Sequence, residues 1–513
     1  MSDCPINKID SNITSLAYAE EECLKQLPAT PIWYNLEPNE YSDFGGDYTR
    51  VSAEPITASR QRKKGNITDL DASGGINQNF TVSNITRLLQ GFLFADAREP
   101  SSTAPLNGAQ IAITGVTAAD KTYALASGGT NFVAGQIIFA EGFANASNNG
   151  LKTVVSSTAT AVVVSETLVD EAAPPATAKF SRVGGQLLAD DVNFAVVDGI
   201  PSIISTTTDF TTFPNFIPGN WLFLGGDDAT SRFANNVGYV RIKSVTAKSV
   251  SFDDTTFTPS NESGTGKSIK FFAGVVIKNE KERSLIKQRS YTFERQLGEG
   301  AVSTQAEYLT GAVASELTLN LSQAELINID ISYTGCDMYY RTGDAGDEIL
   351  TGTRLPVAIE DPYNTASNVY RFKMNIDDPT SSNPDALFAY ISEGTITVNN
   401  NLTANKAIGV LGAFDISAGQ FEVGGSVTAY FQTVEALRAI RNNADIALNA
   451  IFAHDNKGFI FDIPLLGCGG GRLDVAKDEP VMLPLEPAGE ENENGYTLLY
   501  VGFNYLPNIA MPQ

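Results

Sequence analysis

The chain contains one histidine, His454, which stands next to Asp455 in the segment AHDNKG. An imidazole paired with a carboxylate can act as a general base, but a catalytic triad also needs a nucleophile positioned against the imidazole. The segment itself has the composition of a turn between two strands. We therefore interpret His454 as a surface turn residue rather than a catalytic base.

Other segments have the composition of a binding site but lack its spacing. GTGKS at 264–268 resembles the end of a phosphate-binding loop, but Asn261 stands where that loop requires a glycine. The glycines around Cys468 lack the strand and helix context of a dinucleotide site, and the turns DDPTSSNPD and GDAGDE lack the ligand spacing of a calcium loop. We therefore predict no catalytic, cofactor-binding or metal site, and no enzyme activity.

The overall charge argues against a nucleic-acid-binding protein. Lys and Arg total 35 against 59 Asp and Glu, a formal charge of -24, whereas affinity for phosphates comes from cationic side chains. The polar N-terminus MSDCPINKID and the lack of a long apolar run predict neither a signal peptide nor a membrane segment. Scattered cysteines without CxxC spacing fit a reducing cytoplasm, namely Cys4, Cys23, Cys336 and Cys468.

The elements that organise the chain are clearest between residues 391 and 446. Apolar residues from Phe421 to Phe431 alternate with polar ones, which is the period of a strand with one buried face. After Thr433, a candidate N-cap, the period changes to that of a short helix that carries Leu437. The predicted unit is therefore a strand, a polar loop, a long strand and a helix.

The same order of elements is predicted between residues 49 and 94. An Asp-Ala-Gly turn precedes a strand, and SNITRLLQGFLF then follows the helical spacing of apolar residues. We interpret the two units as a duplication. Leu88 and Leu89 should pack under the first sheet and Leu437 under the second.

A second internal repeat matches residues 131–165 with 215–253. Phe132 corresponds to Phe216, Asn148 and Asn149 to Asn235 and Asn236, and glycines recur at matched positions. We interpret these segments as two small β modules inserted into the first copy of the larger unit. The predicted fold is mainly β, with two duplicated β-sandwich or β-barrel domains, each with one flanking α-helix, plus two small inserted all-β modules.

This interpretation divides the chain into six parts. They are an N-terminal arm (1–27), the two parts of the first domain (28–104 and 271–340), inserted modules A and B (105–185 and 186–270), and a second domain with a C-terminal arm (341–513). Because surface insertions are usually tolerated, we expect the modules to project outward and to be removable.

Several segments resemble the tail tube (major tail) protein of long-tailed bacteriophages, over residues 28–98 and 385–506. They are TPIWYNLEP, VSAEPITASRQRKKG, ISEGTITVNNN, FEVGGSVTAYFQTVEALRAI and KDEPVMLPLEP. The resemblance implies β-sandwich domains that join edge to edge into rings, with rings stacked into a tube. It also implies that the loops at 48–68 and 398–411 reach the adjacent ring. The inter-ring contact residues would then be Arg60, Arg62, Lys63, Lys64, Asn405 and Lys406.

The function that the resemblance implies is structural. The chain would form stacked rings in the virion tail, each of three chains with two domains, and would be assembled in the host cytoplasm. DNA would pass through the lumen without specific binding, and the other partners would be the tape measure, tail terminator and distal tail proteins. The modules would be free to contact the host surface. Two alternatives remain open: a tail-tip or host-surface-binding protein, and a glycan hydrolase with paired carboxylates.

Overall fold

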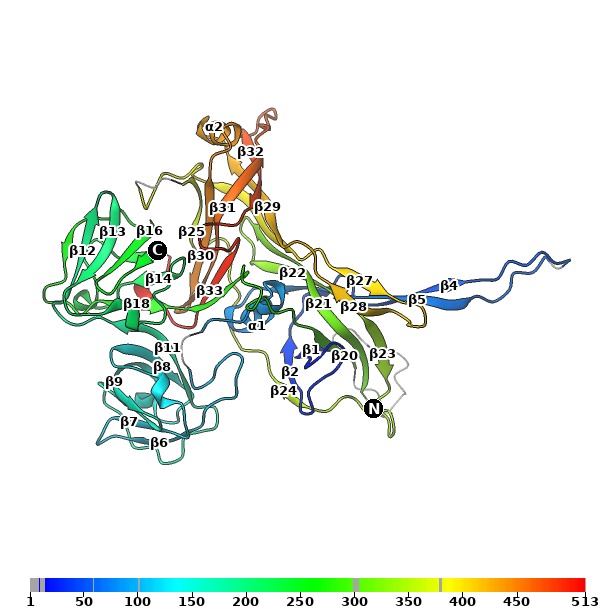
Figure 1. The fold of residues 1–513 in the computed structure, drawn as a ribbon, viewed down its shortest axis with the longest axis horizontal. Coiled ribbons are helices and arrows are strands. Elements are labelled where there is room, and N and C mark those ends of the chain that lie inside the picture. The colour runs from blue at the N-terminus through cyan, green and yellow to red at the C-terminus, as the bar shows by residue number, and fades with distance from the viewer. Residues whose placement is uncertain are drawn as a thin grey trace, which may run out of the picture.

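The structure is a computed structural model of the chain, and it describes residues 9, 14–58, 60–99, 102–298, 304–377 and 381–512. Strands dominate the described chain, and its two α-helices are short (Figure 1). The strands form an 18-stranded sheet system, a 13-stranded sheet and a two-stranded hairpin. The predicted mainly β fold is confirmed.

Two sets of elements follow one another in the large sheet system. The first set comprises β1 (Thr14–Glu20), β4 (Gly45–Val51), β5 (Asn66–Asn79), α1 (Val82–Phe92), β20 (Tyr291–Leu297), β21 (Gln305–Ser322) and β22 (Asn328–Gly335). The second comprises β25 (Val369–Ile376), β26 (Ile391–Asn399), β29 (Glu422–Tyr430), α2 (Glu435–Arg441), β30 (Ile446–His454), β31 (Lys457–Gly470) and β32 (Met482–Gly489).

Both sets have the same antiparallel pairing order. In the first set the order is β4-β5-β22-β21-β20-β1, and in the second it is β26-β29-β32-β31-β30-β25. The two sets are joined where β21 pairs with β26, from Glu316 opposite Asn399 to Ser322 opposite Glu393. The junction makes one continuous sheet that runs from β4 to β32.

Shorter strands extend the two sets. They are β2 (Ile32–Leu36), β3 (Glu40–Tyr41), β19 (Val275–Lys278), β23 (Asp337–Arg341), β24 (Thr353–Leu355) and β33 (Leu499–Phe503). The strands β27 (Thr403–Lys406) and β28 (Ala413–Ser417) form the separate two-stranded hairpin. The first strand of the chain changes one expectation. Within the segment expected to be an N-terminal arm, Thr14–Glu20 pairs with β20 and β2, and Leu16 and Tyr18 are buried.

The helix α1 is at the centre of the main core. Leu88 and Leu89 are each 1% exposed, and the helix contacts β21, β31 and β33. The side chain of its N-cap residue, Thr81, makes no capping hydrogen bond. Instead the carboxylate of Glu360 accepts a hydrogen bond from the backbone N–H of Ser83 at 3.0 Å and forms an ion pair with Lys457 of β31. A carboxylate at a helix N-terminus satisfies free N–H groups and interacts favourably with the helix dipole.

The second helix packs through smaller residues than its sequence period predicts. Ala436 and Ala439 are the buried residues of α2, whereas Leu437 and Ile440 are half-buried at the margin of the main core. Their side chains lie beside Gly471, at the end of β31. The helix therefore covers an end of the second set and contributes less to the core than α1 does.

The inserted modules form the 13-stranded sheet. Its strands are β6 (Ile113–Thr117), β7 (Thr122–Leu125), β8 (Gln136–Glu141), β9 (Gly150–Thr158), β10 (Ala161–Val164), β11 (Lys179–Gln186), β12 (Val192–Val197), β13 (Ile200–Ser205), β14 (Trp221–Leu224), β15 (Gly238–Val245), β16 (Ser249–Thr255), β17 (Glu262–Ser263) and β18 (Lys270–Ala273). Each module also has its own apolar cluster.

Corresponding polar residues occupy equivalent places in the two modules. In module A the amide of Asn148 donates to Glu171, and in module B the amide of Asn236 donates to Glu262. Both asparagines are fully buried. The structure therefore matches Asn148 with Asn236, one position away from the sequence alignment, which matched Asn148 with Asn235.

The modules also share a core with the second set. Trp221, Tyr239 and Phe272 belong to one apolar cluster with residues of β30, β31 and β33, among them Ile460 and Val501. The modules therefore cover the outer face of the second set, although they are inserted in the first. Because deleting them would expose this face, we now predict that the modules are needed for a soluble fold.

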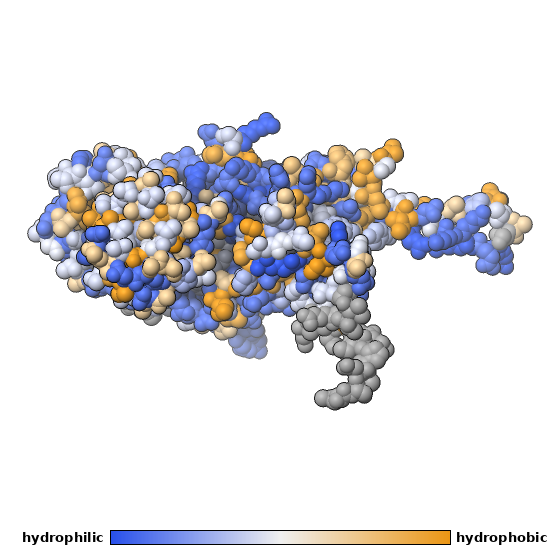
Figure 2. All heavy atoms as spheres, turned by 90° about the horizontal axis from the view of Figure 1, so that it is seen from below, coloured by the Kyte–Doolittle hydropathy of each residue, from blue (hydrophilic) through white to orange (hydrophobic). Residues whose placement is uncertain are grey.

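The β4–β5 hairpin projects far from the body of the molecule, at the opposite side from the modules (Figure 1). Figure 2 shows this arm as a narrow and largely hydrophilic extension. The shorter hairpin β27–β28 lies beside its base (Figure 1). Neither α1 nor α2 has the length and apolar character that a membrane-spanning helix needs.

Candidate functional surface

The continuous sheet has one apolar face and one polar face. Along β22, for example, Ile329, Ile331 and Tyr333 are buried, while the residues between them are exposed or half-buried. The alternation is the period of a strand with one face in the core. The cross-strand register continues both faces from β4 to β32. We call the second face the polar face.

Acidic, amide and hydroxyl side chains make up most of the polar face. They are Asp47 and Thr49 (β4), Asp69, Asp71, Ser73, Asn77 and Asn79 (β5), Asn328, Asp330, Ser332 and Thr334 (β22), Glu316, Thr318 and Asn320 (β21), Glu393, Thr395, Thr397 and Asn399 (β26), Glu422, Ser426 and Thr428 (β29) and Glu486 (β32).

Hydrogen bonds connect these side chains from strand to strand. The amide of Asn320 donates to Asn328 at 2.9 Å and to Asp330 at 2.6 Å, and the amide of Asn77 donates to Asp330 at 2.8 Å. The ladder continues across the junction of the two sets, where the hydroxyls of Thr318 and Thr397 are 3.3 Å apart. Side-chain pairs of this kind stabilise neighbouring strands and hold the polar face in a defined arrangement.

The polar face is acidic, and the cations near it are at the arm, where Arg50 is in β4 and Lys406 contacts Asp69 and Asp71. The described strands β5, β21, β22, β26, β29 and β32 contain neither lysine nor arginine. Phosphate groups bind to proteins mainly through Lys and Arg. These six strands therefore offer a passing polyanion no lysine or arginine to bind.

The predicted inter-ring residues fall into two groups. Arg60, Arg62, Lys63 and Lys64 are exposed on the loop at the tip of the β4–β5 arm. Asn405 and Lys406 make contacts within the chain.

Lys406 connects the two hairpins. Its ammonium contacts Asp69 and Asp71 of β5 at 2.6 Å each, and this hydrogen bond lowers the pKa of the Asp69 carboxyl. The amide of Asn405 donates to Ser417 across the β27–β28 hairpin at 2.7 Å. These two residues brace the shorter hairpin against the longer arm.

Sequence reasoning missed an apolar group on the same hairpin. In the turn between β27 and β28, Ile408 is fully exposed and Val410 and Leu411 are at least two-fifths exposed, as is Phe414 in β28. The signal was present in the sequence, because AIGVLGAF at 407–414 is apolar and uncharged but joins two polar segments. A contiguous exposed apolar group of this kind is typical of an interaction surface.

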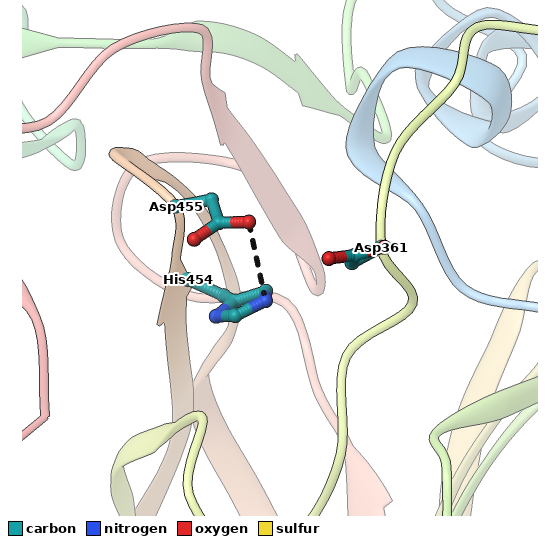
Figure 3. Close-up of side chains that lie close together, drawn as sticks. All are labelled: Asp361, His454 and Asp455. Atoms are coloured by element: carbon teal, nitrogen blue, oxygen red, sulfur yellow. Dashed lines mark ion pairs between the residues drawn. The ribbon is translucent and has the colours of Figure 1, made fainter.

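The only histidine lies away from the polar face. His454 ends β30, and its Nε2 is 3.4 Å from Asp455 in the following turn, with Asp361 nearby (Figure 3). One ligand atom from each of the three residues lies within 4.8 Å of the others, the only such group found among the described residues. Its members are solvent-accessible, and the imidazole lies beside Asp455, its neighbour in the sequence.

The comparisons with known proteins decide the identity of the chain. A family model described as "Phage tail tube protein" matches residues 198–488, more than half of the chain. The chain belongs to this family. A search of curated proteins finds no match.

Membership in the tail tube family assigns a structural role. The matched region includes the sheet from β21 to β32, the junction between the two sets and most of module B. The chain is a structural tail tube protein and a component of the virion tail, and the family implies that it assembles with copies of itself and with other tail proteins. The family is structural, which favours the prediction that the chain is not an enzyme.

Proposed function

We propose that the chain closes into a ring of three copies, that the rings stack into a tube, and that the polar face lines the lumen through which DNA passes. The observation that carries this proposal is the β21–β26 junction. It joins two sets of equal pairing order edge to edge, as separate subunits would join in a ring of single-domain copies.

The strand edges that remain open support closure by the same joint. In the second set, β31 corresponds to β21, and beyond Leu466 it pairs with β32 on one edge and with no described strand on the other. In the first set, β4 corresponds to β26 and pairs only with β5 among the described strands. Pairing of β31 with β4 of the next chain would repeat the β21–β26 junction. Such heterologous contacts close into a ring when the rotation per step allows it, and they also cover exposed edges.

In that ring the apolar side of the sheet is covered by α1 and the outer strands, so the polar face is the side left for the lumen. Its carboxylates repel the DNA backbone and its amides are already paired with one another. DNA would therefore slide through without being retained.

The two projecting hairpins would make the contacts between rings. The tip loop of the arm follows β4, and the β27–β28 hairpin follows the corresponding strand of the second set, β26. The arm and the shorter hairpin lie side by side. The exposed residues Ile408 and Phe414 would be buried against the next ring, and the basic tip at 60–64 would contact its acidic surface. The fixed Lys406 sets the position of the apolar turn rather than making the contact itself.

The stoichiometry is tested by native mass spectrometry of rings released from tubes, with negative-stain microscopy of the same sample. We expect a mass near three times 54.8 kDa and pseudo-sixfold inner symmetry. A ring of six chains would show that only one set per chain lines the lumen. Discrete particles without rings or tubes would favour the tail-tip, host-binding alternative.

The lumen assignment has its own test. Thr318→Lys places a cation on the polar face, and Thr318→Glu is the matched acidic control. We expect both variants to form tubes, but only the lysine variant to slow DNA ejection, more strongly at low salt because the added contact is electrostatic. Equal ejection rates in all three proteins would place the polar face outside the lumen.

A further inference from the structure

The main core opens to the surface at one end of the β21–β26 junction. A cavity of about 360 Å³ lies there, and its apolar lining belongs to the main core or packs against it. Leu321 and Phe452 form its buried part, while Val369, Phe372 and Ile391 are only half-buried. The cavity therefore has an apolar wall that a partner can reach, and we call it the core pocket.

The core pocket is uncharged, although the protein is strongly acidic. None of the described residues that line it is Asp, Glu, Lys or Arg. Two of its hydroxyls are already bonded within the chain, because Thr365 donates to the carbonyl of Ser322 at 2.6 Å and Ser392 donates to the carbonyl of Thr428 at 3.1 Å. The pocket therefore favours an uncharged, apolar partner.

The apolar turn at 407–414 has the matching character. It contains no charged residue, and Ile408 at its tip is fully exposed. Its shape is fixed in the free chain, because the N–H of Val410 donates to the carbonyl of Ala407 at 3.2 Å and Lys406 holds the hairpin against β5. A segment that is ordered before it binds loses little entropy on binding. A cavity of about 150 Å³ holds a benzene-sized group, so the core pocket has room for Ile408 and a second side chain of the turn.

The core pocket and the apolar turn lie at opposite ends of the same strand. β26 begins at Ile391, in the lining of the pocket, and ends at Asn399, shortly before the hairpin β27–β28. The hairpin extends toward the side of the arm (Figure 1). A strand of nine residues is about 25–30 Å long. The turn therefore lies far from the pocket of its own chain, whereas a second copy displaced along β26 would bring its pocket to the turn.

We propose that the apolar turn of each chain inserts into the core pocket of a second copy in the next ring. This proposal rests on the stacking of rings proposed above and names the surface that receives the turn. The partner is a copy of the chain because the family assembles with copies of itself and because turn and pocket occur together in each chain. The contact joins different surfaces, and such contacts repeat along an open assembly such as a tube.

Disulfide cross-linking in assembled tubes tests the contact directly. Ile408→Cys places a thiol in the turn, and Ala366→Cys places one on an exposed residue of the pocket lining. After oxidation, tubes of the double variant should give a ladder of covalent multimers on a non-reducing gel. Tubes assembled from a mixture of the two single variants should give dimers only. Val197→Cys in module B, combined with Ala366→Cys, is the control pair and should give only the background of the native cysteines.

Assembly of variant rings provides a second measurement. Ile408→Asp should raise the protein concentration at which tubes form by about tenfold or more, because burial of one branched apolar side chain contributes about that factor. The matched control Val197→Asp, in an exposed valine of module B, should assemble as the wild type does. Ala366→Trp fills the mouth of the pocket and should stop assembly at single rings. Rings of these two pocket and turn variants, when mixed, retain one working turn and one working pocket, so they should form ring pairs that grow no further.

The contact and the stacking of rings fail in different ways. Tubes of the double cysteine variant without a ladder, together with normal assembly of Ile408→Asp, would overturn the contact and leave stacking intact. Wild-type rings that never form tubes in negative-stain images would overturn both proposals. Wild-type rings that stack only after another tail protein is added would overturn the choice of a second copy as the partner.

Discussion

Glu262 of module B offers the sharpest test of the energetics, because one carboxylate satisfies several donors. It accepts hydrogen bonds from the N–H of Asn235 at 3.0 Å and from the amide of Asn236 at 3.1 Å, and it forms an ion pair with Lys267 at 2.7 Å. Its side chain is 12% exposed. Burial acts to raise the pKa of this carboxyl, but the hydrogen bonds from Lys267 and the backbone outweigh it and lower the pKa from 4.5 to about 2.

The shift converts into a stability contribution. A difference of 2.5 between 4.5 and about 2, at about 1.36 kcal/mol per pKa unit, is roughly 3 kcal/mol. Because the folded-state pKa is depressed, this contribution is complete above the unfolded-state value and is lost as the pH falls toward 2. The Glu262→Gln variant has no carboxylate at this position, so it lacks this contribution at every pH. We therefore expect it to destabilise module B by about 2–3 kcal/mol at pH 7 and by progressively less at lower pH.

Urea unfolding followed by tryptophan fluorescence measures this difference. The chain has two tryptophans, so in a Trp33→Phe background the buried Trp221 reports on module B and on the core that it shares with the second set. Glu282→Gln removes an exposed carboxylate and is the matched control for the charge change. A Glu262→Gln effect below about 0.5 kcal/mol at pH 7, or one of equal size at pH 7 and pH 3, would refute the assigned hydrogen-bond network.

Three further outcomes follow from the fold. Leu88→Asp should abolish soluble protein in an expression trial, because it places an unpaired charge in the main core, whereas Leu437→Asp at the half-buried α2 should remain soluble. Replacing residues 105–270 by a Gly/Ser linker should give aggregated protein by size-exclusion chromatography, and a soluble, tube-forming deletion would contradict the shared core. Glu360→Gln should destabilise the first turn of α1 by about 1 kcal/mol, read from faster amide exchange at Ser83, and unchanged exchange would remove its capping role.

Local periodicity in the sequence was sufficient for much of the fold. Strand alternation between Phe421 and Phe431 identified the apolar face of β29, in which Val423, Val427 and Ala429 are buried, because this strand has one face in the core. The spacing of Leu88 and Leu89 placed α1 for the same reason. The polar face could have been predicted as well, since the residues between the buried positions of β21 and β22 are polar and uncharged or acidic.

Pairings between distant segments could not be predicted in the same way. Any alternating strand satisfies the pattern of β26, so nothing local specifies that it pairs with β21. The sequence contains a weak indication that another part of the chain packs on the second set. β30 and β33 are apolar on both faces, as IALNAIFA and LYVGF show, and a strand buried on both faces needs a second covering layer. The sequence does not say which part of the chain supplies that layer.

The two sets have the same strand pairing order, but different segments of the chain cover their outer strands. This difference affects the symmetry expected for the ring. The modules cover the second set, whereas the corresponding outer strands of the first set are covered by a nearby loop, in which Ile349 and Leu350 pack with Trp33 and Tyr308. The two sets are therefore interchangeable at the inner sheet and distinct outside it. A ring built as proposed would have six similar positions around the lumen but project modules from alternate ones. In the proposed ring, a threefold outer surface around a nearly sixfold channel would follow from placing both sets in one chain.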